Sequence, residues 1–179
     1  ELHDNLNITS IFVTHDQSEA IEISDKIVVI NRGKVEQVGN AHEIYEYPES
    51  RFVASFIGQV NVIDAFVRQD KIIIKDTSLA IDNQGTEAPD GSEIVLLVRP
   101  EDIMLKECST SNSLECRINK IHYRGSFYEI DIALGAFSIK AIENKNSFMI
   151  DKWREHQNVA VEFKKYKIFD IIGGHGAVR

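Results

Sequence analysis

The pattern of hydrophobic and polar residues changes its period near residue 58. Before that point, residues 8–14 form a continuous apolar and β-branched run, and residues 16–24 are rich in helix formers. A continuous run, rather than an alternation, is typical of a strand buried on both faces of a parallel sheet. The N-terminal part therefore predicts a strand, a loop and a helix in succession.

A hairpin and two short helices are predicted to follow. Residues 26–30 and 34–38 are β-prone and flank an Asn-Arg-Gly turn, whose glycine can take the positive φ of a tight hairpin. Asn40 can cap the first helix, a second helix begins after Pro48, and Gly58 closes it.

A lone buried strand cannot form a parallel sheet, because its backbone groups need neighbouring strands on both sides. Residues 1–5 also read as part of a helix with no cap in front of it. We therefore expect residues 1–58 to be the end of a larger α/β domain, and the chain to be the C-terminal fragment of a longer protein.

The remaining two-thirds of the chain consist of short β-prone runs separated by turn residues. They predict an all-β barrel or sandwich over residues 59–179, so that the fold class is α+β overall. Trp153 is expected in the core or at the domain interface, and Tyr123, Phe127 and Tyr128 inside the barrel. The predicted strands cover residues 61–68, 71–75, 93–99, 114–122, 128–134, 136–142 and 158–163.

Composition narrows the classes of function. The 179 residues carry a formal net charge of −8, and residues 1–58 alone hold 4 basic and 10 acidic residues. This acidic balance argues against nucleic-acid binding, which depends on Lys and Arg to neutralise phosphates. Cys108 and Cys116 indicate neither a disulfide scaffold nor a zinc site. No apolar run reaches the ~20 residues that a membrane span needs.

The N-terminal part also contains a recognisable motif. Residues 11–20 read Ile-Phe-Val-Thr-His-Asp-Gln-Ser-Glu-Ala, and residues 24–39 read Ser-Asp-Lys-Ile-Val-Val-Ile-Asn-Arg-Gly-Lys-Val-Glu-Gln-Val-Gly. This pattern, continued through residues 44–48 and 52–58, resembles the switch-loop end of the nucleotide-binding subunit of ABC importers.

The resemblance implies a role for His15. In that family a histidine at the end of a core strand reaches the γ-phosphate of ATP, where a preorganised donor stabilises the charge that develops as water attacks. His15 matches that histidine, so it is the candidate catalytic and ATP-contacting residue. Asp16 is expected to cap the following helix, and Gln17 and Glu19 to be solvated helix residues.

Other motifs of the family are missing from the 179 residues. They contain no Gly-x-x-x-x-Gly-Lys-Ser/Thr phosphate loop and no Leu-Ser-Gly-Gly-Gln signature, and the magnesium-binding Asp and catalytic Glu are missing too. The resemblance therefore implies ATP and Mg²⁺ in the full-length protein. It implies no cofactor, no metal site and no ATPase activity in this fragment.

The resemblance also implies partners and a location. A second copy of the ATPase subunit and membrane permease subunits are expected as direct partners, and an extracytoplasmic substrate-binding protein as an indirect one. The protein would then be cytoplasmic and peripheral on the inner face of the plasma membrane.

The C-terminal part resembles the transport-associated OB domain of many importer subunits. The motifs that carry this resemblance are Val-Arg-Pro-Glu-Asp-Ile (residues 98–103), Tyr-Arg-Gly-Ser (residues 123–126) with Glu129, and Lys-Ile-Phe-Asp (residues 167–170). In that family the module packs against its copy in the second subunit and can carry regulation, including anion sensing in some members. Arg99, Arg124 and Ser126 are therefore candidate anion-site residues, although structural hydrogen bonding explains each of them at least as well.

The transported substrate is less constrained. Residues 56–61 are similar to the corresponding stretch of sulfate and thiosulfate importers, which favours sulfate or thiosulfate. Importers of molybdate, ferric iron, polyamines and sugars share the architecture and stay open as alternatives. A stand-alone OB-type ligand-binding module and a purely structural dimerisation piece are further alternatives.

Overall fold

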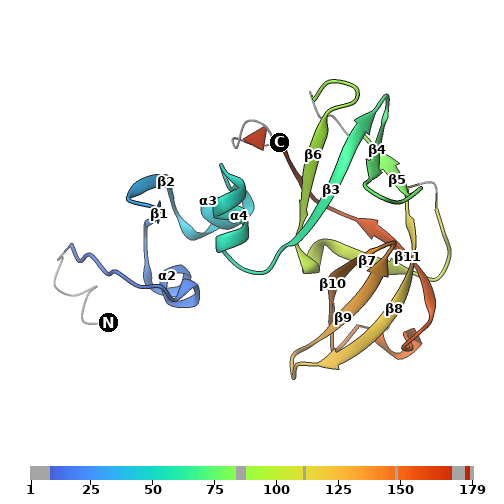
Figure 1. Ribbon diagram of the computed structural model, residues 1–179. Helices are drawn as coiled ribbons and strands as arrows, with labels where there is room; N and C mark the ends of the chain where they lie inside the picture. Colours follow the sequence, from blue (N-terminus) through green and yellow to red (C-terminus); the bar gives the residue numbers. More distant parts are fainter. Residues whose placement is uncertain (1–8, 84–87, 111, 148, 171–175, 178–179) are drawn as a thin grey trace.

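The computed structural model describes residues 9–83, 88–110, 112–147, 149–170 and 176–177. A small unit of short helices and one hairpin lies beside a larger unit made of strands (Figure 1). None of the helices in these ranges has the length and apolar character of a membrane span.

The elements follow one another in a simple order. The helices are α2 (Gln17–Ile23), α3 (Ala41–Glu46) and α4 (Arg51–Phe56), with short 3₁₀ turns at η1 (Pro100–Asp102) and η2 (Ile150–Lys152). The strands are β1 (Ile27–Asn31), β2 (Lys34–Gly39), β3 (Asn61–Arg68), β4 (Lys71–Ile74), β5 (Ala80–Asp82), β6 (Glu93–Val98), β7 (Ile103–Lys106), β8 (Leu114–Tyr123), β9 (Phe127–Leu134), β10 (Phe137–Asn144), β11 (Asn158–Phe163), β12 (Lys167–Asp170) and β13 (Gly176–Ala177).

The larger unit consists of two antiparallel sheets around one core. One sheet has the strand order β13-β12-β6-β3-β4-β5, and the other has the order β10-β9-β8-β11-β7. Alternate residues of the strands are buried, as in β3, where Ile63, Ala65 and Val67 point into the core that both sheets share. This arrangement confirms the all-β, barrel-like fold expected of an OB-type module.

The aromatic residues divide between core and surface. Trp153 is 2% exposed and packs in the shared core, as predicted. Tyr123 is 62% exposed, so the prediction that it lies inside the barrel is wrong, while Phe127 and Tyr128 are half-buried. The alternation of β8 breaks at the register shift between Ile118 and Lys120, and Tyr123 is the last residue of the strand.

The smaller unit has a core of its own, formed by β1, α3 and α4 (Figure 1). Its buried residues are Ile27, Val29, Ile44, Val53 and Ile57. The predicted hairpin is confirmed, with Gly33 in the turn at a φ of 77°. The predicted cap is confirmed as well, because Asn40 and Glu43 exchange side-chain-to-backbone hydrogen bonds of 2.9 Å at the start of α3.

Strand β6 joins the two units because it is buried on both faces. One face lines the barrel core. On the other face, Val95 and Leu97 pack with Ala54 of α4 and Phe169 of β12. The helices of the smaller unit therefore cover a sheet face that would otherwise expose apolar side chains to water.

The strand predicted at residues 8–14 is not formed. Residues 9–14 have no strand pairing, and Ile11 and Val13 are 92% and 91% exposed. A strand buried on both faces needs neighbours on each side, and within the described residues no strand pairs with this segment. The predicted helix at residues 1–5 lies outside the described residues.

Leu96 offers a test of the shared core, because it is fully buried at the centre of β6. The Leu96→Ala variant leaves a cavity, so we expect the free energy of unfolding to fall by about 2–5 kcal/mol in urea denaturation. Val62→Ala on the neighbouring β3, where the side chain is 42% exposed, should change it by less than about 0.5 kcal/mol. Equal losses in the two variants would contradict the central position of β6.

Candidate functional site

His15 lies on an exposed loop directly before α2. Asp16 caps that helix, since its Oδ1 accepts hydrogen bonds from the N–H groups of Ser18 at 2.8 Å and Glu19 at 3.2 Å. The Thr14 hydroxyl accepts a hydrogen bond from the Asp16 N–H at 2.9 Å and donates one to the Glu19 carboxylate at 3.0 Å. The backbone around His15 is thus tied down, while its imidazole is open to solvent and makes no hydrogen bond with the described residues.

Gln17 is not the solvated helix residue that the sequence predicts. It is half-buried, and its Oε1 accepts a hydrogen bond from the backbone N–H of Gly58 at 2.8 Å. Gly58 has a φ of 77°, and a Cβ at this position would come within 3.1 Å of the Arg99 and Tyr45 side chains. The first residue of the helix after His15 is therefore bonded to the junction between the two units.

Arg99 is the centre of that junction. Its Nη1 donates to the carbonyl groups of Ile57 at 2.8 Å and Gln59 at 3.3 Å, and its Nη2 donates to the carbonyl of Tyr45 at 3.0 Å. The guanidinium carbon lies 3.6 Å from the centre of the Tyr45 ring, which is a cation–π contact. These bonds occupy three of the five N–H donors of the guanidinium.

Two further polar contacts connect α3 to the larger unit made of strands, which we call the strand unit. The Tyr45 hydroxyl donates a hydrogen bond to Glu101, and Lys165 pairs with Glu46. Burial, together with the hydrogen bond to Glu101, raises the pKa of Tyr45 to about 12. Tyr45 is therefore a neutral donor at physiological pH, and its bond to Glu101 persists.

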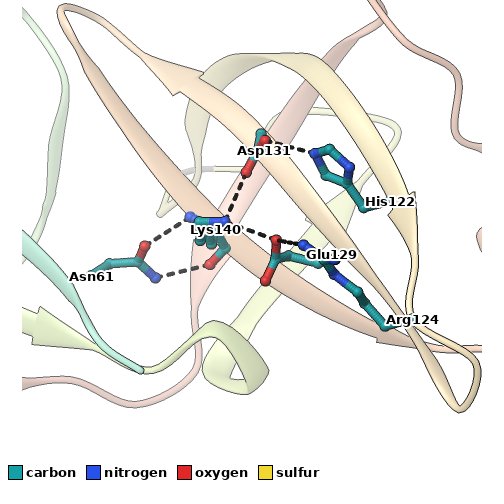
Figure 2. Close-up of polar contacts among 6 residues, drawn as sticks. All are labelled: Asn61, His122, Arg124, Glu129, Asp131 and Lys140. Carbon is teal, nitrogen blue, oxygen red and sulfur yellow. Dashed lines mark hydrogen bonds and ion pairs between the residues drawn. The ribbon is translucent and has the colours of Figure 1, made fainter. Parts of the chain in front are cut away.

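A second polar group, the Glu129 cluster, lies on β8, β9, β10 and the turn between β8 and β9. It consists of His122, Arg124, Glu129, Asp131 and Lys140 (Figure 2). Glu129 accepts hydrogen bonds from Lys140 at 2.8 Å and Arg124 at 3.0 Å. Lys140 also lies 3.4 Å from Asp131, which in turn is 3.1 Å from Nε2 of His122. The hydrogen bonds from Lys140 and Arg124 hold the pKa of Glu129 below its ordinary value, and the bond to Glu129 raises the pKa of Lys140.

Asn61 links this cluster to the other sheet (Figure 2). Its side-chain amide donates to the carbonyl groups of Lys140 at 2.9 Å and Val98 at 3.1 Å, and its Oδ1 accepts from the Lys140 N–H at 2.7 Å. Since Asn61 is buried, these bonds satisfy its polar atoms where water does not reach them. The amide therefore bridges β3 and β6 to β10.

The structure places the predicted anion-site residues in different surroundings. Arg99 is at the junction, Arg124 is paired with Glu129, and Ser126 is exposed between β8 and β9. Within the described residues, no hydrogen bond or ion pair joins these three side chains to one another. An anion at Arg124 would have to compete with the Glu129 carboxylate, and the anion site stays a prediction.

His122, Glu129 and Asp131 could in principle offer ligand atoms to a metal ion, since these atoms lie within 4.8 Å of one another. However, the Lys140 ammonium already lies within 2.8 Å of Glu129 and 3.4 Å of Asp131. It supplies the positive charge that a metal would bring, so the cluster is neutralised internally and we assign no metal to it.

The Glu129→Gln variant tests whether this cluster stabilises the fold. Because the pKa of Glu129 is lowered in the folded chain, its contribution to folding stability is complete above its ordinary pKa of 4.5. That contribution is lost as the pH falls through the lower pKa of the folded state. The variant should therefore be less stable than wild type at neutral pH, with a difference that shrinks below pH 4.5 in urea denaturation.

Glu143→Gln is the matched control, because Glu143 lies on β10 and forms no ion pair with the described residues. It should show little change in stability at neutral pH. A stability difference for Glu129→Gln that stays constant down to acid pH would contradict the role of the ionised carboxylate.

Comparisons with known proteins match part of the strand unit or most of the chain. Residues 96–169, from β6 to β12, match the family described as the TOBE domain. A solved structure, that of the cytoplasmic molybdate-binding protein ModG with molybdate bound, is 16% identical with a TM-score of 0.48, and covers 60% of this chain and 94% of that chain.

Relatives of known name match a larger part of the chain. The sulfate/thiosulfate import ATP-binding protein of Thermosynechococcus vestitus is 40% identical over 133 residues, which are 74% of this chain and 35% of that protein. Its namesake from Gloeobacter violaceus is 37% identical over 175 residues, or 96% of this chain and 45% of that protein. The spermidine/putrescine import ATP-binding protein of Mycoplasmopsis synoviae is 35% identical over 155 residues, or 85% of this chain and 34% of that protein.

The chain thus spans less than half the length of each of these relatives. The similarity covers both the unit that contains His15 and the strand unit, since the longest of the three matches takes in 96% of the chain. The chain is therefore similar to import ATP-binding proteins over most of its length, and its residues 96–169 match the TOBE domain family.

Proposed function

We propose that the chain is the C-terminal part of the ATP-hydrolysing subunit of an ABC importer. The observation that carries the proposal is the ungapped motif around His15, in a chain related to import ATP-binding proteins. The geometry supports it, because the His15 imidazole is exposed on a loop that Thr14 and Asp16 tie down. A donor held in this way can address a phosphate with little rearrangement of its backbone.

His15 would then donate a hydrogen bond to the γ-phosphate as charge develops there during hydrolysis. The residues of this chain do not suffice to hold ATP or Mg²⁺, since the 179 residues contain no glycine-rich phosphate loop. The triphosphate and the metal ion would therefore be held by other parts of the longer protein. The chain alone is expected to be inactive.

We divide the chain at Gly58 into the end of the ATPase domain, residues 1–58, and a transport-associated OB-like domain, residues 59–179. Separate hydrophobic cores support this division. The second domain would act in regulation and dimerisation. Arg124 and Ser126 are exposed enough to contact an anion there, and Arg99 has two N–H donors left for the same purpose.

The proposed function implies specific protein partners. The subunit would form a homodimer and bind membrane permease subunits at the cytoplasmic face of the plasma membrane. It would meet the extracytoplasmic substrate-binding protein only through those permeases, and it would bind no nucleic acid. The acidic net charge of −8 agrees with the last point.

Sulfate or thiosulfate is the substrate we favour. The join at residues 56–61 is similar to that of sulfate importers, and relatives of that name reach 40% identity. A polyamine is the second candidate, because spermidine/putrescine relatives reach 35–39% identity. Uptake of labelled sulfate and of labelled spermidine by cells lacking the gene separates the two, since only the true substrate should fail to enter.

The His15→Ala variant of the full-length subunit tests the catalytic assignment. If His15 acts mainly on the transition state, ATP affinity should stay nearly unchanged while the ATPase turnover falls by about a hundredfold or more. Nucleotide affinity, ATPase rate and melting temperature should be measured on the same preparation. Transport is expected to fail together with turnover.

His42→Ala is the matched control, because His42 is exposed on α3 of the same unit. It should leave the ATPase rate near that of wild type. Near-normal turnover in a stable His15→Ala protein would remove the role proposed for His15. A joint loss of thermal stability, binding and turnover would show instead that His15 is structural.

The 179-residue chain itself should not bind ATP appreciably, because positioning and charge neutralisation of the triphosphate require the phosphate loop. Calorimetry with MgATP tests this expectation. Micromolar affinity would contradict the assignment of nucleotide binding to other parts of the protein. A reading frame upstream of Glu1 that lacks a phosphate loop and a signature sequence would likewise overturn the transporter proposal.

A further inference from the structure

A pocket lies at the junction, where α3, α4, β6, η1 and β12 come together. About 350 Å³ of space lies between its walls, including open solvent at its mouth. Pro48, Ala54 and Leu97 contribute apolar walls, and Arg99, Asp102 and Lys167 contribute charged groups. Apolar walls with a few charged groups are typical of sites for small molecules.

Lys167 is the unusual residue of this pocket. Its side chain leaves β12 on the same face as Phe169, and the residue is only 8% exposed. Its ammonium lies 4.9 Å from the centre of the Tyr47 ring, but no described residue forms a hydrogen bond or ion pair with it. Burial lowers the pKa of Lys167, and the nearby charge of Lys165 acts in the same direction.

Asp102 lines the same pocket and carries the opposite charge. Its backbone N–H and carbonyl are bonded to Arg99 and Lys164, but its carboxylate has no hydrogen bond or ion pair within the described residues. Burial raises the pKa of Asp102. Asp102 and Lys167 do not form an ion pair with each other, so the pocket holds one charged group of each sign that has no ion-pair partner among the described residues.

The other charged groups of the pocket have partners within the described residues, although two N–H donors of Arg99 stay unbonded. Lys165 pairs with Glu46, and Arg99 is bonded to backbone carbonyl groups. A simple anion would be attracted by the Lys167 ammonium and repelled by the Asp102 carboxylate. A simple cation would be repelled by the ammonium and attracted by the carboxylate. A molecule with both charges would compensate the two groups at once.

We propose that the junction pocket binds a free α-amino acid with a small side chain. The carboxylate of the ligand accepts hydrogen bonds from the Lys167 ammonium, and its ammonium group donates to the Asp102 carboxylate. The side chain of the ligand lies against Ala54 and Leu97. Because the pocket is built from both units, such a ligand stabilises the junction between the unit that contains His15 and the strand unit.

The experiment compares three probes on the 179-residue chain by calorimetry and by NMR chemical-shift perturbation. L-alanine carries both charges, propionate lacks the ammonium group, and ethylamine lacks the carboxylate. We expect L-alanine to shift amides around Leu97 and Lys167, and each of the other probes to bind at least about tenfold more weakly. Sulfate and spermidine are titrated in parallel as a divalent anion and a polycation.

Two variants assign the contacts. Lys167→Met keeps the apolar stem and removes the charge, and Asp102→Asn keeps the shape and removes the negative charge. Each should weaken the binding of L-alanine by at least about tenfold. Lys164→Met is the control, because Lys164 is exposed, lies outside the pocket and should leave affinity unchanged.

Each outcome decides the proposal. Propionate, sulfate or spermidine binding as well as L-alanine in the pocket would overturn the two-charge assignment, and so would unshifted pocket amides with L-alanine. Should Lys167→Met not fold, as judged by circular dichroism, the comparison of probes on the wild-type chain still decides. None of these measurements depends on ATP hydrolysis or on the proposed importer function.

Discussion

The hydrogen bonds of the Arg99 guanidinium determine how the two units of the chain are joined. They end on the carbonyl groups of Tyr45 and Ile57, near the C-terminal ends of α3 and α4, where helix carbonyls lack partners of their own. The helix dipole favours a cation at such ends, and the planar guanidinium of Arg99 reaches both helices at once. Stacking on the Tyr45 ring then fixes the orientation of the guanidinium.

Burial of β6 depends on this junction. With α4 held near the sheet, Ala54 covers the face of β6 that carries Val95 and Leu97, and the strand becomes buried on both sides. The β6 residues of the other face remain in the barrel core. A change at the junction is therefore expected to affect both hydrophobic cores. Gln17 extends the same contact through Gly58 to the start of α2.

Local sequence patterns predicted several strands even where their pairing partners are distant in the chain, as for β11, which pairs with β7 and β8. The β-prone runs at residues 61–68 and 158–163 gave β3 and β11 with their observed bounds, and Asn40 was predicted as the cap of α3. The patterns failed for residues 8–14, because an apolar run becomes a strand only if other strands pair with it. They also missed the short strands β5, β7 and β12, which have three or four residues each.

The candidate sites show the same limit. His15 could be selected from a local motif, whereas the contacts of Gln17 and the pocket around Lys167 and Asp102 depend on residues far apart in the chain. Charge alone would not have separated the pocket from the Glu129 cluster, since both mix cations with carboxylates. In the Glu129 cluster every charge is compensated by a neighbour, so it stabilises the sheet and leaves no charged group free for a ligand. At the junction Lys167 and Asp102 have no ion-pair partner within the described residues, and this difference is the basis of the proposed ligand.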